Sequence, residues 1–125
     1  MPFFAEIPAE GFETLTRKMK QHSVATNEKV IRQGDSGKRL YMIARGVVRI
    51  SQRIDGEEVN LATLIAGDFF GEMALLHDGD RTATVTSISL CTFNILERDD
   101  LQHAMLDNPA IRKALEVADK QRHKH

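Results

Sequence analysis

Short segments rich in β-branched and apolar residues, separated by glycine-containing turns, constrain the fold of this chain most strongly. Asp55-Gly56 lies between two segments in which apolar and polar residues alternate. It is a hairpin signal, because a type I′ turn needs positive φ at its central residues. Many short strands spaced by glycine turns indicate an antiparallel barrel or a jelly roll. The expected fold class is mainly β with flanking helices, an antiparallel β-roll of the jelly-roll type. The expected strands cover 29–32, 40–45, 47–54, 58–65, 82–87 and 90–96, with further turns at 34–37, Gly46 and Gly67-Asp68.

Apolar residues recur at helical intervals near both ends of the chain, over 9–21 and over 98–122. Asn108 followed by Pro109 gives an N-cap with proline at the first helical position, so the second stretch is expected to form two helices. The defining positions are Phe12, Leu15 and Met19, then Leu101, Ala104 and Met105, then Ile111, Leu115 and Ala118. The expected plan is one domain over 1–125, with a β-roll over 22–97 between the helices.

Composition excludes several classes of protein. The formal net charge of −1 shows no excess of positive charge that would bind a polyanion, so nucleic acid is not expected as the main ligand. No apolar run approaches the ~20 residues of a membrane span, and the N-terminus does not resemble a secretory signal. A single cysteine, Cys91, excludes an internal disulfide and fits a reducing cytosol, so we expect a cytoplasmic domain.

The histidines show no metal-ligand spacing, and neither a Cys–His nor a Ser–His–Asp arrangement is suggested. We therefore expect no metal and no catalytic site. A cupin-like metalloenzyme is an alternative of similar size, but that class needs clustered His and Glu ligands.

Residues 70–84 carry the groups that a small anionic ligand with a sugar hydroxyl needs. Gly71 allows a close backbone approach, and the amides that open the turn over 72–76 point at an anion. Glu72 can accept hydrogen bonds from hydroxyls, and the Arg81 fork can hold a phosphate through two parallel bonds. Taken alone, Glu72 would be interpreted as an ordinary acid exposed to solvent. The presence of Arg81 downstream favours the interpretation that Glu72 belongs to a binding site.

The run Phe-Gly-Glu-Met-Ala-Leu-Leu at 70–76, followed by Arg-Thr-Ala at 81–83, resembles the phosphate-binding cassette of the cyclic nucleotide-binding domain family. Gly34-Asp35, the strand over 40–43 and Gly46 are also similar to the family pattern, so the resemblance covers nearly the whole chain. It implies that Glu72 holds the ribose 2′-hydroxyl and Arg81 the cyclic phosphate. The implied ligand-binding residues of the cassette are Phe70, Gly71, Glu72, Met73, Ala74, Arg81, Thr82 and Ala83, with main-chain amides and the Thr82 hydroxyl completing the phosphate cradle.

The chain departs from the family pattern at two positions. Asp80 stands where most relatives have a proline before the cassette arginine, and Lys38 stands where the family often has an acid.

The Arg-Thr-Ala variant is typical of nucleotide-gated channels and of cGMP-dependent kinases. In relatives, a hydroxyl at the position of Thr82 supports the binding of cGMP, yet channels with the same three residues prefer cAMP. We therefore take cAMP, and not cGMP, as the expected ligand.

Two further contacts are expected with the purine. Ile50 and Leu61 alternate with polar residues on the strands flanking Asp55-Gly56, where each would either line the purine site or serve in core packing. Arg122 extends the apolar stripe of the last helix. It is either a snorkelling arginine at a helix C-terminus or, as the resemblance to the channel lid helix implies, a residue that caps the purine.

These features predict a regulatory module that senses a cyclic nucleotide and is not an enzyme, with no cofactor besides that ligand. The last helix is expected to fold over the bound nucleotide and to act on an effector outside this chain, with no direct membrane contact. A nucleotide-gated cation (potassium) channel is the first expectation. The alternatives are a transcription regulator, although no helix-turn-helix is present in the sequence, or a kinase or transporter.

Overall fold

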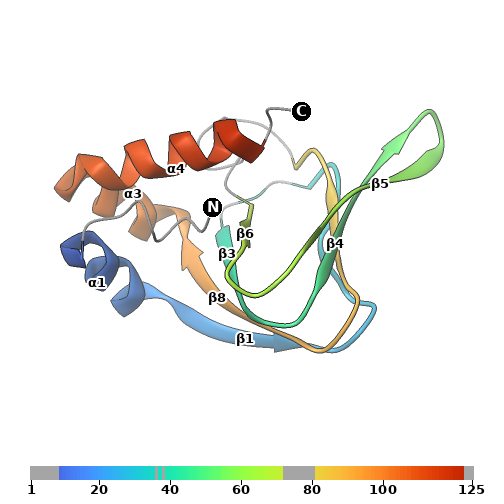
Figure 1. Ribbon diagram of the computed structural model, residues 1–125, viewed down its shortest axis with the longest axis horizontal. Coiled ribbons are helices and arrows are strands. Elements are labelled where there is room, and N and C mark those ends of the chain that lie inside the picture. Colours follow the sequence, from blue (N-terminus) through green and yellow to red (C-terminus); the bar gives the residue numbers. More distant parts are fainter. Residues whose placement is uncertain (1–8, 36, 38, 72–80, 123–125) are drawn as a thin grey trace.

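The computed structural model describes residues 9–35, 37, 39–71 and 81–122. Within these ranges one helix precedes the strands and two helices follow them (Figure 1). The elements are α1 (Ala9–Lys18), β1 (Lys20–Val24), β2 (Lys29–Ile31), β3 (Arg39–Arg45), β4 (Val48–Ile54), β5 (Glu57–Leu64), β6 (Phe69–Phe70), β7 (Thr84–Ser87), β8 (Cys91–Glu97), α3 (Arg98–Asp107) and α4 (Pro109–Arg122).

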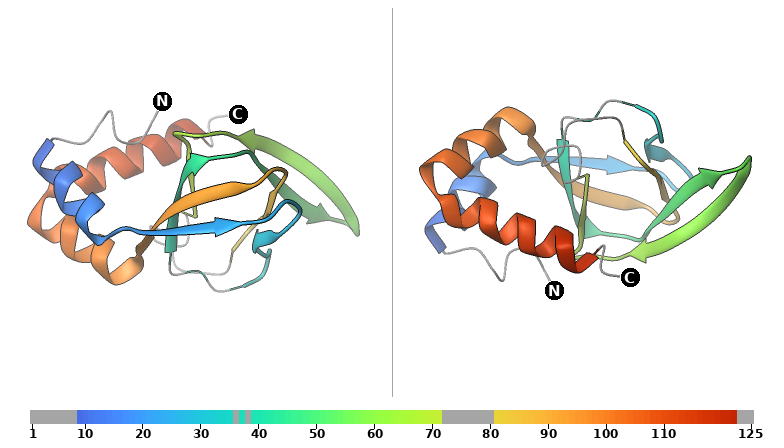
Figure 2. Two further views of the ribbon diagram at one scale, coloured as in Figure 1. Left: turned by 90° about the horizontal axis from the view of Figure 1, so that it is seen from below. Right: turned by 90° about the horizontal axis from the view of Figure 1, so that it is seen from above.

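The strands form two four-stranded sheets in which every paired neighbour is antiparallel. The first sheet has the order β1-β8-β3-β6 and the second the order β2-β7-β4-β5. Figures 1 and 2 show the helices gathered at one end of the roll, while the β4–β5 hairpin extends from the other. The predicted fold class, an antiparallel β-roll with an N-terminal helix and two C-terminal helices, is confirmed.

β3 is buried on both of its faces, which explains its unbroken apolar run. Successive strand side chains point to opposite faces, so Leu40 and Met42 meet the helices while Tyr41 and Ile43 face the interior of the roll. The helical core comprises Leu15, Leu40, Met42, Phe69, Leu96, Leu101, Ala104, Met105, Ile111, Ala114 and Leu115. The roll core comprises Val24, Ile31, Tyr41, Ile43, Val48, Phe70, Val85, Cys91, Phe93 and Ile95.

The start of α4 agrees with the capping signal in the sequence. The amide of Ala110 donates a hydrogen bond to Oδ1 of Asn108 at 3.2 Å, and Pro109 occupies the first helical position. None of the helices within the described ranges is long and apolar enough to cross a membrane.

The helix expected over 9–21 ends earlier than predicted, at Lys18. Met19 fits the helical spacing and packs against the helical core, but Lys20 already lies opposite Ile95 at the start of β1. β1 was not predicted because it is an edge strand whose first four residues are all exposed. Such a strand lacks the apolar alternation by which strands are found in sequences.

The β4–β5 hairpin has the predicted turn, with φ of 52° at Asp55 and 83° at Gly56. Its register is interrupted by an irregularity next to Ile50. As a result Ala62, not Leu61, lies opposite Ile50, and Leu61 is 51% exposed. Leu61 thus belongs to neither core cluster, so the core-packing alternative does not hold for it, and its contact with a purine stays a prediction.

Candidate functional site

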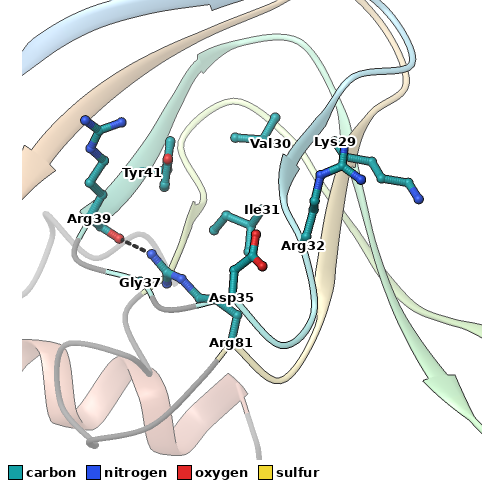
Figure 3. A pocket seen from close by; sticks show the side chains of 9 residues that line it. All are labelled: Lys29, Val30, Ile31, Arg32, Asp35, Gly37, Arg39, Tyr41 and Arg81. Atoms are coloured by element: carbon teal, nitrogen blue, oxygen red, sulfur yellow. Dashed lines mark hydrogen bonds between the residues drawn. The ribbon is translucent and has the colours of Figure 1, made fainter.

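Arg81 is the centre of the site and lies three residues before the start of β7. It is only 9% exposed. Its Nη1 donates a hydrogen bond to the carbonyl oxygen of Gly71 at 2.8 Å, and its Nη2 donates to the carbonyl oxygen of Arg39 at 3.0 Å (Figure 3). These bonds replace water around a buried cation, which would otherwise be costly to desolvate.

The turn between β2 and β3 holds the backbone of Arg81 as well. The Arg81 amide donates to the carbonyl oxygen of Asp35 at 2.7 Å, and the Gly34 amide donates to the carbonyl oxygen of Arg81 at 2.8 Å. On the other side, Gln52 of β4 donates through Nε2 to the Thr82 carbonyl oxygen at 3.1 Å. The position of the arginine is thus fixed by segments from three distant parts of the chain.

Two glycines approach the guanidinium. Gly71 has φ of 92°, and a Cβ placed there would lie 2.7 Å from the Arg39 carbonyl oxygen and 3.0 Å from Nη1 of Arg81. A Cβ placed on Gly37 would overlap the guanidinium itself. A side chain at either position would therefore disturb the arginine, directly or through its acceptor.

A cavity of about 350 Å³ opens beside Arg81. Its charged side chains are four cations and one carboxylate, so its electrostatic character favours an anion. Tyr41, Val30 and Ile31 supply apolar surface, which small-molecule sites commonly contain (Figure 3). The charged lining residues are Lys29, Arg32, Arg39, Arg81 and Asp35.

Arg39 is a fixed positive charge at this cavity. A hydrogen bond with Tyr41 and the Coulombic attraction of Glu97 raise the pKa of the Arg39 guanidinium above its ordinary value. Its Nε lies 2.9 Å from Oε1 of Glu97, the residue opposite it on β8. Both side chains are about half exposed, so this ion pair orients Arg39 more than it stabilises the fold.

An aromatic cluster supports the floor of the site. The rings of Tyr41 and Phe70 are stacked at a centroid distance of 4.9 Å, and both meet Phe93 edge to face. Phe70, expected among the ligand-binding residues, is 2% exposed and belongs to the roll core. It stacks on Tyr41, which lines the cavity, and its own contact with a ligand stays a prediction.

The remaining expected residues have different outcomes. Glu72, Met73 and Ala74 lie outside the described residues, as does the side chain of Arg122, the last residue of α4. The pairing of Glu72 with Arg81 around a ligand therefore stays a prediction. Of the described residues, Thr82 is exposed, Ala83 is half-buried, and Ile50 is half-buried against the roll core.

Sequence reasoning missed the residues that surround Arg81 from β2 and β3. Nothing in the sequence singles out Lys29, Arg32 or Arg39, and Gly37 is expected only as a turn residue. The family-like pattern around Gly34-Asp35 marked this turn, but nothing in it indicated a contact with Arg81. In the described part of the chain, no group of three or more His, Cys, Asp or Glu residues is placed to hold a metal ion.

Comparison with known proteins identifies the family. A family model described as the cyclic nucleotide-binding domain matches residues 21–108, which include both sheets except the first residue of β1, and all the residues that line the cavity. The chain belongs to the cyclic nucleotide-binding domain family.

Relatives of different kinds carry similar sequences. The chain is 31% identical over 117 residues to the potassium/sodium hyperpolarization-activated cyclic nucleotide-gated channel 2 of Mus musculus, covering 94% of the chain and 13% of the channel. It is 29% identical over 113 residues to a CRP-like cAMP-activated global transcriptional regulator of Mycobacterium tuberculosis, covering 90% of the chain and 50% of the regulator. The chain thus corresponds to half or less of the length of each.

Solved structures show the same architecture. The catabolite activator protein of Thermus thermophilus is similar with a TM-score of 0.90 and 27% identity, covering 99% of this chain and 59% of that one. The regulatory domain of Toxoplasma gondii PKA, solved with cAMP, is similar with a TM-score of 0.78 and 35% identity, covering 82% of this chain and 39% of that one.

Proposed function

We propose that this domain binds cAMP, in preference to cGMP, through a cyclic phosphate held by Arg81. The observation that carries the proposal is a buried guanidinium, fixed by main-chain carbonyls, beside a cavity whose charged lining is mostly cationic. A phosphate diester is a compact anion that accepts paired, charge-assisted hydrogen bonds from arginine. The regulator from Mycobacterium tuberculosis is described as cAMP-activated, and the PKA domain from Toxoplasma gondii was solved with cAMP.

The rest of the cassette would complete the binding of the nucleotide. In this proposal Glu72 accepts hydrogen bonds from the ribose 2′-hydroxyl, and the amides of residues 71–74 and Ala83 donate to the phosphate. The Thr82 hydroxyl also contacts the ligand, and its exposure leaves it accessible. Ile50 lies on the inner side of the roll, where it would contact the purine.

Binding would be signalled through α4. This helix packs Ile111 and Leu115 into the helical core, which it shares with Leu40 and Met42 of β3. The residue between those two, Tyr41, lines the cavity. A ligand that binds one position of α4 better than another would shift the helix between them, and Arg122 would cap the purine in the bound state.

The effector of such a sensor lies outside this chain. We propose a nucleotide-gated cation (potassium) channel, with this domain on its cytoplasmic side and no catalytic role of its own. The similarity to the mouse channel over 94% of the chain supports this assignment. A transcription regulator is the second candidate, supported by the regulator from Mycobacterium tuberculosis; a kinase has support from the PKA domain.

Isothermal titration of cAMP and cGMP into the unmutated chain and into Arg81→Ala tests the proposed ligand. We expect cAMP to bind more tightly than cGMP. Truncating one partner of a buried charge pair costs roughly 2–5 kcal/mol, so Arg81→Ala should weaken cAMP at least about thirtyfold. 5′-AMP, which carries the same base and sugar without the cyclic diester, serves as the ligand control. Absence of heat with both cyclic nucleotides for the unmutated chain would reject the function.

A further inference from the structure

We propose that Gly37 is a positioning residue for Arg81: its missing side chain is what allows the guanidinium to lie against the β2–β3 turn in the orientation that meets the ligand. This inference rests on the proposed function, because it takes Arg81 as the residue that binds the phosphate. Gly37 lies 44 residues before Arg81 in the sequence and is not part of the cassette.

The contact is unusually close. A Cβ built on Gly37 would overlap Nε, Cζ and Nη2 of Arg81, three atoms of the guanidinium group. The φ of Gly37 lies outside the left-handed region, unlike that of Gly71, so its backbone conformation is open to other residues. Space for the arginine, and not backbone freedom, is therefore the reason for glycine at this position. Figure 3 shows the Arg81 side chain running past Gly37 toward the Arg39 carbonyl oxygen.

The same turn holds Arg81 at three other points. Gly34 and Asp35 bond its backbone, and the Arg39 carbonyl oxygen accepts from Nη2. A side chain on Gly37 would have to displace either the guanidinium or the turn. Since the backbone bonds of Arg81 tie it to that turn, the guanidinium is the part that moves. It would then lose the 3.0 Å bond to Arg39 and the 2.8 Å bond to Gly71.

A displaced guanidinium remains charged but no longer presents its fork in one orientation. Recognition of a phosphate by paired hydrogen bonds depends on that orientation. Gly37→Ala should therefore raise the dissociation constant for cAMP at least about tenfold, which corresponds to about 1.4 kcal/mol.

The first test measures coupling in the nucleotide-free protein. Urea denaturation of Gly37→Ala, Arg81→Ala and the double variant shows whether the two positions interact. We expect Gly37→Ala to lower the denaturation midpoint when Arg81 is present. The double variant should have the same midpoint as Arg81→Ala alone, because without the guanidinium there is no overlap. Equal losses in both backgrounds would overturn the inference. If Gly37→Ala does not fold, recovery of folding in the double variant supports the inference, and failure of the double variant overturns it.

The second test is isothermal titration with cAMP, using Gly56→Ala as the matched control. Gly56 has φ of 83° and open space around its Cα, so alanine there strains the backbone far from Arg81. We expect Gly56→Ala to lose stability but to keep the unmutated dissociation constant, while Gly37→Ala loses affinity. An unchanged affinity in Gly37→Ala would overturn the inference. If the unmutated chain binds neither cyclic nucleotide, the proposed function fails, whereas the denaturation experiment still decides whether Gly37 positions Arg81.

Discussion

Arg81 places a positive charge beside the cavity and donates two of its hydrogen bonds to main-chain carbonyls. Carbonyl oxygens carry only partial charge, so these two bonds do not themselves neutralise the guanidinium. The cations Lys29, Arg32 and Arg39 around the cavity add to that attraction.

Replacing Arg81 with lysine separates charge from geometry. Arg81→Lys keeps the cation but lacks the planar fork, so it cannot reproduce the paired hydrogen bonds. We expect its dissociation constant for cAMP to lie between those of the unmutated chain and Arg81→Ala, about tenfold above the former. Isothermal titration measures the difference. An Arg81→Lys chain that binds as tightly as the unmutated one would show that charge alone suffices.

Ser87 provides a test of stability away from the ligand. It is fully buried, and its hydroxyl joins the β1–β2 turn to β7 by donating to the Ala25 carbonyl oxygen at 2.6 Å and accepting from the Glu28 amide at 2.9 Å. Ser87→Ala leaves both main-chain groups without that partner. We expect a loss of about 1–3 kcal/mol in the free energy of unfolding, measured with urea.

Ser23→Ala is the matched control for Ser87→Ala. Its hydroxyl is also within hydrogen-bond distance of a partner, Thr92 Oγ1 at 3.0 Å, but the pair is exposed to water. The free energy of unfolding should change by less than about 0.5 kcal/mol. Equal losses for the two serines would contradict the importance assigned to the buried hydroxyl.

At the scale of elements, β3 connects the proposed ligand site with the helices. Tyr41 lines the cavity on one face of the strand, while Leu40 and Met42 pack with α4 residues on the other. Figure 2 shows α4 running from the helical end back toward β3 and β6. In the proposed function, a small displacement of β3 would be transmitted to α4 by this direct packing.

The role of α4 as a lid is tested at its last residue. In Arg122→Ala the cation proposed to cap the purine is missing, so we expect a fluorescent cAMP analogue to dissociate about three to ten times faster in stopped-flow measurements. A cation over an aromatic face contributes about 1 kcal/mol, which is consistent with that range. The matched control is Arg112→Ala on the same helix, where Arg112 Nε pairs with Glu116 Oε1 at 3.0 Å on an exposed surface. Equal dissociation rates for Arg122→Ala and the unmutated chain would remove the capping role.

At the scale of the whole molecule, the sequence predicted the β-roll because its strands alternate and its turns contain glycine. It predicted two C-terminal helices from Asn108-Pro109, a local signal. Strand β1 was not predicted, because an exposed edge strand has no apolar pattern. The helix before it was predicted to extend too far, because no apolar pattern marks where β1 begins.

The candidate site was predictable only where its chemistry is local. Arg81 lies in a short motif and could be found there. Its two described acceptors, at Gly71 and Arg39, are main-chain carbonyls, which leave no trace in side-chain identity. Gly37 and the cations Lys29 and Arg32 lie on or just after β2, which pairs with β7 more than forty residues later in the chain. Only the folded chain shows that they are neighbours.

The central claim is that Arg81 binds the cyclic phosphate inside the roll. A crystal structure of this chain with cAMP tests it most directly, through the distances from the guanidinium nitrogens to the phosphate oxygens. The account predicts that two of these distances are about 2.7–2.9 Å, as in charge-assisted pairs. A complex in which cAMP is bound but its phosphate is beyond hydrogen-bond distance of Arg81 would contradict it.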